Sequence, residues 1–193
     1  MKGLNEKILF FFGENINLPE IYPGSLSHAY LSILSDDLDS AYIIFSNIDS
    51  PRGKWGCSLT TVLKGYMTVY PTYFGIRNFL EIDLDFLLKN NKIEYVEQCL
   101  GALEVYSAIN QETYKFAARV MLENHLNSSA LKYLDRSKQI FYNDAELHYM
   151  YAKYYMDINN YANAYFYINE CLKLLPGYYP AIVMKQKIEE NGF

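Results

Sequence analysis

Cysteine is scarce in this chain of 193 residues, which contains only three cysteines, at positions 57, 99 and 171. An odd number of widely spaced cysteines forms neither a disulfide framework nor a four-ligand zinc site. We therefore expect Cys57, Cys99 and Cys171 to be reduced thiols that lie mostly in the core.

Basic residues and long apolar runs are also few. Lys and Arg number 17 against 22 Asp and Glu, so the formal net charge is −5. A general nucleic-acid binder would need many more cations against phosphates. The longest apolar runs, such as residues 8–12, fall far short of the roughly 20 residues that a membrane-spanning helix needs, and no secretory signal is recognisable. We expect a cytoplasmic protein with no nucleic-acid partner and no membrane partner.

Motifs of catalysis are absent as well. The sequence has no P-loop, no glycine-rich dinucleotide motif, no His-Glu-x-x-His, no Gly-x-Ser-x-Gly and no Cys-x-x-Cys. We interpret His28, His125 and His148 as packed or capping histidines, because they are far apart in the sequence. The acidic residues at 36, 37 and 39 lack the glycine and the distal glutamate of a calcium loop, which favours a helix-connecting turn with an N-cap. No enzyme activity, catalytic residue, metal or cofactor is predicted.

Helical periodicity runs through most of the chain. From residue 77 onward, apolar blocks of helical spacing alternate with short polar segments that suit the turns of antiparallel helix pairs. The segment Leu80 to Leu88 alternates apolar and acidic residues like a strand for several positions. We favour a helix there, because Leu80, Leu84 and Leu87 then share one face and the neighbouring segments are helical.

The spacing of small and bulky residues recurs when the chain is shifted over itself by about 34 residues. The last copy contains His148, Tyr151, Ala152, Tyr155, Ala164, Ile168 and Pro176. The copy before it contains Tyr114, Ala117, Ala118, Met121, Ala130 and Leu134, and the weakest contains Leu80, Asp83, Leu84, Leu87, Val96 and Leu100. These residues resemble the tetratricopeptide repeat family over residues 77–178, and most closely over 145–178.

The resemblance implies an all-α fold, an α-α superhelix or solenoid of antiparallel helix pairs at 77–110, 111–144 and 145–178. Ala152 and Ala164 would be small because the two helices of a pair approach closely there. Pro176 would end a helix, and residues 179–193 would form a C-terminal capping helix, since stacked repeats need a polar end.

The first third of the chain is less regular. Small and bulky residues around positions 36–37 suggest a degenerate repeat over 22–55. The region 56–76 holds an extra helix, expected from Trp55 to Val69, and a short helix is expected over 4–12. We predict one continuous array over residues 1–193 with irregular N-terminal helices.

The resemblance also implies which residues line the concave surface, namely the fifth, ninth and twelfth positions of each repeat. The predicted partner-binding residues are Glu81, Asp85, Lys115, Arg119, Leu122, Tyr149, Lys153 and Met156. With Leu88, they form an acidic stretch followed by three cations with apolar residues between them. This pattern would suit a peptide or helical segment that carries acidic or carboxylate groups.

These features predict a non-enzymatic adaptor or scaffold that binds a protein or peptide partner. The alternatives are a bacterial secretion-type chaperone of the same family and an accessory or regulatory subunit of an enzyme, and a homo-oligomer is left open. Ser50–Gly56, which carries the only tryptophan, is either an exposed recognition loop or a turn whose Trp55 anchors the next helix.

Overall fold

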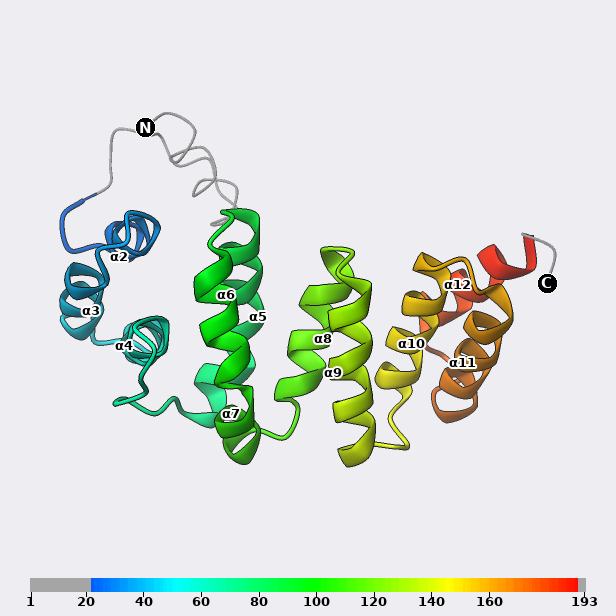
Figure 1. The fold of residues 1–193 in the computed structure, drawn as a ribbon. Helices are drawn as coiled ribbons and strands as arrows, with labels where there is room; N and C mark the ends of the chain where they lie inside the picture. Colours follow the sequence, from blue (N-terminus) through cyan, green and yellow to red (C-terminus); the bar gives the residue numbers. More distant parts are fainter. Residues whose placement is uncertain (1–21, 191–193) are drawn as a thin grey trace. The chain divides into compact units, whose positions relative to one another are not determined.

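The computed structural model describes residues 22–190, and these residues form eleven α-helices and no strand (Figure 1). The predicted all-α class is confirmed. The helix expected over residues 4–12 lies outside the described residues. The three cysteines are free, with Cys99 and Cys171 buried and Cys57 half-buried.

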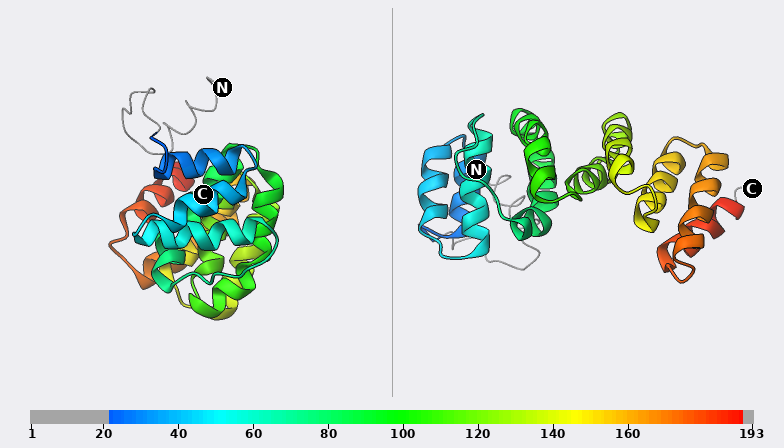
Figure 2. Two further views of the ribbon diagram at one scale, coloured as in Figure 1. Left: turned by 90° about the vertical axis from the view of Figure 1, so that its left-hand side faces the viewer. Right: turned by 90° about the horizontal axis from the view of Figure 1, so that it is seen from below.

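The contacts divide the chain into two compact units, which meet in the sequence between Asn110 and Gln111. Within each unit, helices that follow one another in sequence pack together (Figure 2). The first unit contains α2 (Leu26–Leu34), α3 (Leu38–Ser46), α4 (Pro51–Leu63), α5 (Tyr73–Lys89), α6 (Ile93–Gly101) and α7 (Leu103–Ile109). The second contains α8 (Thr113–Glu123), α9 (Asn127–Ile140), α10 (Ala145–Asp157), α11 (Tyr161–Leu174) and α12 (Tyr179–Glu190).

Left-handed turns separate the helices at the spacing of the sequence repeat. Asn91, His125 and Asn159 have φ values of 56°, 55° and 57°, and each follows the previous one by 34 residues. At each turn, the next residue donates its backbone N–H to a carbonyl five residues earlier, as Lys92 does to Leu87 at 2.9 Å. This pair of features is the Schellman ending of a helix. These turns confirm the prediction that short polar segments separate the helices from residue 77 onward.

The same turn closes the first two helices. Asp36 has a φ of 63°, and the backbone N–H of Asp37 donates to the carbonyl of Ser32 at 2.9 Å. The Asp37 side chain then caps α3 by accepting from the backbone N–H of Ser40 at 3.0 Å. The acidic residues at 36 and 37 thus form a helix-connecting turn with an N-cap, as the sequence predicted.

Helix α4 begins and ends earlier than expected. It was predicted from Trp55 to Val69 but spans Pro51–Leu63. Ser50 caps its first turn by accepting from the backbone N–H of Gly53 at 3.0 Å, and Pro51 occupies the first turn, where it is tolerated. Gly65 ends the helix with a φ of 84°, a conformation that costs glycine little.

The exposed-loop interpretation of Ser50–Gly56 is wrong. Trp55 is 1% exposed and lies within α4, so it anchors this helix in the core. The glycines beside it allow close packing, since a Cβ added to Gly56 would lie 2.2 Å from the ring of Phe45. A Cβ on Gly53 would lie 2.1 Å from the carbonyl oxygen of Ile48.

A buried carboxylate joins three helices of the first unit. Asp83 of α5 is 1% exposed and accepts hydrogen bonds from Arg52 Nη2 at 2.5 Å, Trp55 Nε1 at 2.5 Å and the Tyr30 hydroxyl at 3.0 Å. Burial raises the pKa of Asp83, although the charge of Arg52 and these hydrogen bonds oppose the shift. We call these four residues the Asp83 cluster. It fixes α2 and α4 against α5.

The segment after the Asn91 turn, predicted as the second helix of the 77–110 repeat, is divided into two helices. Helices α6 and α7 are separated at Ala102, whereas the corresponding α9 and α11 are continuous. The repeat predicted over 77–110 therefore contains three helices, and its first helix begins at Tyr73, where Thr72 provides the N-cap.

Small residues lie in the core formed by α10, α11 and α12, as the repeat pattern predicted. Ala152 and Ala164 are fully buried beside Ile168 and Cys171. Helix α11 ends at Leu174, two residues before Pro176. Helix α12 follows and contributes Ala181 and Ile188 to the same cluster.

Replacing Gly56 by alanine is expected to destabilise the protein by about 1–3 kcal/mol, because the new methyl group would overlap the Phe45 ring. Gly101→Ala is the matched control, since a Cβ there meets nothing within 4 Å and alanine is favoured in a helix. Denaturant unfolding of both variants measures the difference. A Gly101 variant less stable than the Gly56 variant would contradict this packing.

Removing the carboxylate of Asp83 is expected to cost about 3–5 kcal/mol, because Asp83→Ala leaves the Arg52 guanidinium largely buried without its counter-charge. Asp85→Ala, two residues along the same helix, removes a more exposed ion pair with Lys89 and should cost about 0–1 kcal/mol. Thermal and denaturant melts of the two variants test this order. Equal losses would show that the Asp83 cluster does not hold the unit together.

Candidate protein-interaction surface

Six of the eight predicted binding residues lie on two neighbouring helices of the second unit. Lys115, Arg119 and Leu122 belong to α8, and Tyr149, Lys153 and Met156 belong to α10. The first turn of α10 is set by Asp144, whose carboxylate accepts from the backbone N–H groups of Glu146 at 2.8 Å and Leu147 at 3.2 Å. We call the side of the unit formed by these six residues the α8/α10 face.

Lys115 is not the exposed cation that the sequence suggested. It is 4% exposed, and its Nζ lies 2.8 Å from Asp144, 3.0 Å from Glu146 and 3.2 Å from Glu112. Burial opposes the charge of this ammonium group, but the carboxylates of Asp144 and Glu146 outweigh burial and raise its pKa. Lys115 is therefore a structural cation that joins α8 to the start of α10.

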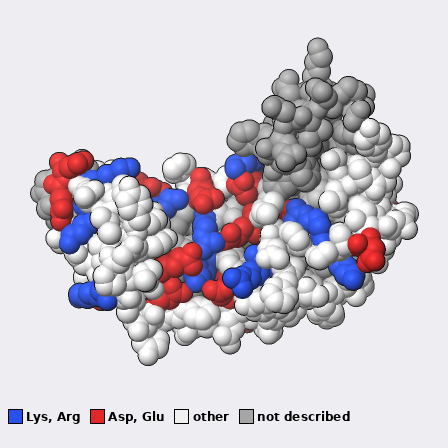
Figure 3. Space-filling view, turned by 180° about the vertical axis from the view of Figure 1, so that it is seen from behind, with Lys and Arg blue, Asp and Glu red and all other residues white. Residues whose placement is uncertain are grey.

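Arg119 is also neutralised within the unit. Its guanidinium lies 2.6 Å from Glu146 Oε1, so Glu146 bridges both cations of α8. Basic side chains lie directly beside acidic ones on the face drawn in Figure 3. Two of the three predicted cations, Lys115 and Arg119, are therefore matched by carboxylates of the same unit.

Leu122 is 1% exposed and belongs to the core, so it cannot meet a ligand from solvent. By contrast, Tyr149, Lys153 and Met156 are each partly exposed. Lys153 makes no ion pair with any residue in the described part of the chain. That these three residues bind a partner stays a prediction. They share one side of α10, where Tyr149 and Met156 also pack against the buried cluster that contains Ala152 and Ile168.

The structure adds Tyr178, which the sequence did not single out. Its ring packs edge-on against that of Tyr149 at 5.3 Å between centroids. Burial, and secondarily the charge of Glu146, raises the pKa of Tyr178. It lies two residues after Pro176, next to Gly177, and this Pro-Gly turn signal could have marked it, since the chain turns there into α12.

Glu81 and Asp85 belong to the first unit, and both are partly buried on α5. Asp85 pairs with Lys89 at 2.5 Å. That these acidic residues and the cations of α8 and α10 line one surface stays a prediction.

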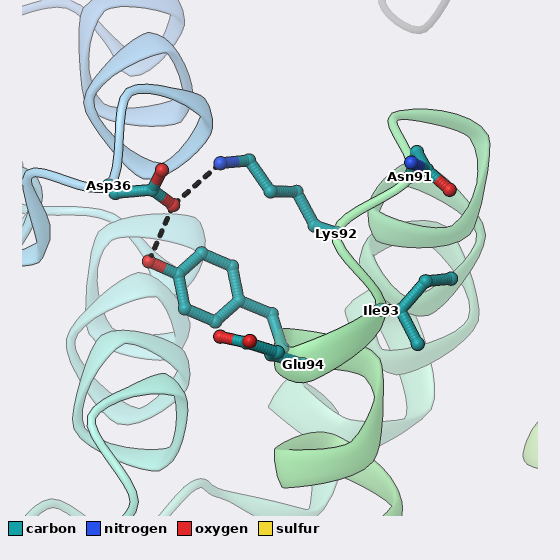
Figure 4. Close-up of a pocket in the computed structure, with 6 residues that line it drawn as sticks. Asp36, Asn91, Lys92, Ile93 and Glu94 are labelled. Carbon is teal, nitrogen blue, oxygen red and sulfur yellow. Dashed lines mark hydrogen bonds and ion pairs between the residues drawn. The ribbon is translucent and has the colours of Figure 1, made fainter.

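The first unit has a polar recess of about 320 Å³ at the turns before α3 and α6. Its centre is the Asp36 carboxylate, which points toward the Lys92 ammonium group at 2.5 Å and accepts from the Tyr95 hydroxyl at 2.9 Å (Figure 4). Hydrogen bonds from Lys92 and then Tyr95 lower the pKa of Asp36, while burial followed by the Asp36 hydrogen bond raises that of Tyr95 to about 12. The recess thus contains paired groups that link two turns.

Neither a metal site nor a membrane span is found within residues 22–190. No group of three or more His, Cys, Asp and Glu side chains in this range could hold a metal ion. None of the helices in the same range has the length and apolar character required to cross a bilayer.

Comparison with protein-family models, with curated proteins and with solved structures finds no match to the chain. The likeness to tetratricopeptide repeats therefore depends on the residues and turns described above.

The Lys115 network is expected to stabilise the second unit only while its carboxylates are ionised. Burial alone would raise the pKa of Asp144, but Lys115, and after it the backbone N–H groups of Leu147 and Glu146, outweigh burial and lower it. Because the pKa of Asp144 is lower in the folded state than in the unfolded state, its carboxylate stabilises the fold above about pH 4, the usual pKa of an Asp side chain. This stability is lost as the pH falls through the pKa of the folded state.

Asp144→Asn tests this dependence, because asparagine can still cap α10 but carries no charge. At pH 7 the variant should be less stable than the wild type by about 1.5–3 kcal/mol. The difference should shrink as the pH falls below about 4, where the wild-type carboxylate is protonated as well. Denaturant melts across this pH range measure it. A difference that does not change with pH would mean that Asp144 acts through the cap alone.

Proposed function

We propose that the protein is a non-enzymatic adaptor whose helix pairs stack as a tetratricopeptide-like solenoid and bind a segment of a partner protein on the α8/α10 face. The observation that carries this proposal is the recurrence of one turn geometry at Asn91, His125 and Asn159, in register with the small and bulky residues of the repeat. Helix pairs that cannot bury their apolar faces alone are expected to stack.

The chemistry of the α8/α10 face suggests what such a partner would offer. Tyr149, Lys153 and Met156 are spaced four and three residues apart and share one side of α10. Along this side, an aromatic ring is followed by a cation without an internal counter-ion and then by a thioether. An apolar segment with a carboxylate at its centre would match it, with its apolar side chains against Tyr149 and Met156.

Lys153, rather than Lys115, is the residue on which recognition would depend. Reversing Lys115 would place another carboxylate beside Asp144, Glu146 and Glu112, which would destabilise the unit whether or not it binds a partner. A partly exposed lysine without an ion pair can be reversed at little cost to folding.

Affinity capture from the native host with Lys153→Glu tests the proposal. We expect the variant to lose at least one protein that the wild type captures, with about a tenfold lower yield, since charge pairs at an interface set specificity. Lys54→Glu, at an exposed lysine of the first unit, is the control of equal charge change. Quantitative mass spectrometry measures the yields, and thermal melts confirm the fold. If every captured protein is retained by Lys153→Glu, this face is not the binding surface.

A further inference from the structure

The first unit has a second recess, of about 280 Å³, between the end of α4 and the helices α6 and α7, which the proposed function does not use. Its lining includes Val62, Tyr66, Met67, Gln98, Gly101 and Val105. Pockets that enclose whole small molecules have about 300–1,000 Å³. This recess is therefore of a size that receives one or two side chains of a protein segment. We call it the α4/α6 recess.

Apolar side chains at the α4/α6 recess are exposed. Tyr66 is 54% exposed and Val105 is 42% exposed. Gly101 lies between them without a side chain, and a Cβ built on it would meet no atom within 4 Å. A glycine lets another chain approach the helix backbone closely. The recess thus combines exposed apolar surface with room for an incoming side chain.

Carboxylates border the recess on the side of α6 and α7. The backbone N–H of Ala102 donates to the carbonyl of Gln98 at 3.1 Å, and the carbonyl of Ala102 accepts from the residue four positions later at 3.0 Å. The helical turn therefore continues across the break between the two helices. Glu97, Gly101 and Glu104, spaced by four and three residues, lie on the same side because of this continuity. Both glutamates are exposed.

The border of the recess lacks basic residues of its own. Helices α6 and α7 together contain three glutamates and neither Lys nor Arg. Lys64 and Lys92, which directly precede the two lining segments, each lie 2.5 Å from an aspartate of the α2–α3 hairpin. Glu97 makes no ion pair with any residue in the described part of the chain. Its negative charge is therefore not compensated within the unit.

We infer that the α4/α6 recess is a second docking surface, and that its occupant is a basic amphipathic segment of a partner protein. An apolar side chain of the segment enters the recess beside Gly101, and a Lys or Arg next to it meets Glu97. Charge complementarity is the basis for this occupant, because glutamates line the border of the apolar recess. An acidic segment would be repelled there.

The test uses two fluorescein-labelled helical peptides of about 15 residues, each with Leu at every third or fourth position along one side. One has Lys beside the leucines and the other has Glu at the same positions. Fluorescence anisotropy gives their dissociation constants for the full chain. We expect the Lys peptide to bind at least about tenfold more tightly than the Glu peptide.

Filling the recess tests where the Lys peptide binds. Gly101→Leu is expected to weaken its binding about tenfold or more, because the leucine side chain occupies the space that the peptide needs. Gly177→Leu in the second unit is the matched control, since a Cβ there also meets no atom within 4 Å. Neither glycine has a positive φ, so both positions accept leucine. The control should alter the affinity less than about twofold, and circular dichroism melts confirm that both variants are folded.

Reversing one carboxylate tests the charge argument. Glu97→Lys should weaken binding of the Lys peptide about tenfold or more, and it should reduce the loss of affinity between about 20 and 300 mM salt. Glu123→Lys, at an exposed glutamate that ends α8, changes the net charge equally and should alter the affinity less than about twofold. Lys153→Glu should stay within the same limit, which separates this recess from the α8/α10 face.

Several results would overturn the inference. One is no binding of the Lys peptide by the wild type up to about 1 mM, the affinity of a weak contact. Another is equal weakening by Gly101→Leu and Gly177→Leu, and a third is equally tight binding of the Glu peptide. If sedimentation shows a wild-type dimer that Gly101→Leu converts to a monomer, the occupant is a second copy of this chain and not a basic segment of a partner.

Discussion

The helix pairs depend on a backbone conformation that most residues avoid. Asp36, Asn91, His125 and Asn159 all adopt a left-handed conformation without being glycine. Asp, Asn and His tolerate this region better than most side chains, and the hydrogen bonds that close each turn offset the remaining cost. Because each turn ends one helix and starts the next within three residues, the two helices must run antiparallel and in contact.

This constraint explains why so much of the fold could be predicted. The turn residues are polar and the intervening small residues recur at the same spacing, so positions such as Ala152 and Ala164 could be assigned to the core from the sequence. The limits of α4 could not, because Ser50, Pro51 and Gly65 act through local geometry that apolar periodicity does not report. The break at Ala102 directly follows Gly101, a residue that weakens a helix, but the repeat spacing does not report it.

The candidate site was harder to predict, because a repeat position specifies a side of a helix but not the charges opposite it. Lys115 occupies the position expected to face a ligand, yet the carboxylates of Asp144 and Glu146, at the start of α10, enclose it. Lys153 occupies the position equivalent to that of Arg119, one repeat later, and has no such neighbours. The difference depends on where acidic residues fall at the start of the next helix, which only the folded unit shows.

The Asp83 cluster has a consequence for how the first unit folds. Most helix contacts in each unit join neighbours in the chain, which favours rapid folding because little loop entropy is lost. The hydrogen bond from Tyr30 to Asp83 instead spans 53 residues. Closing so long a segment is entropically costly until α4 has packed between its ends. We therefore expect the α2–α3 hairpin to form early as a local structure, and its attachment to α5 to be the step that limits the folding rate of the unit.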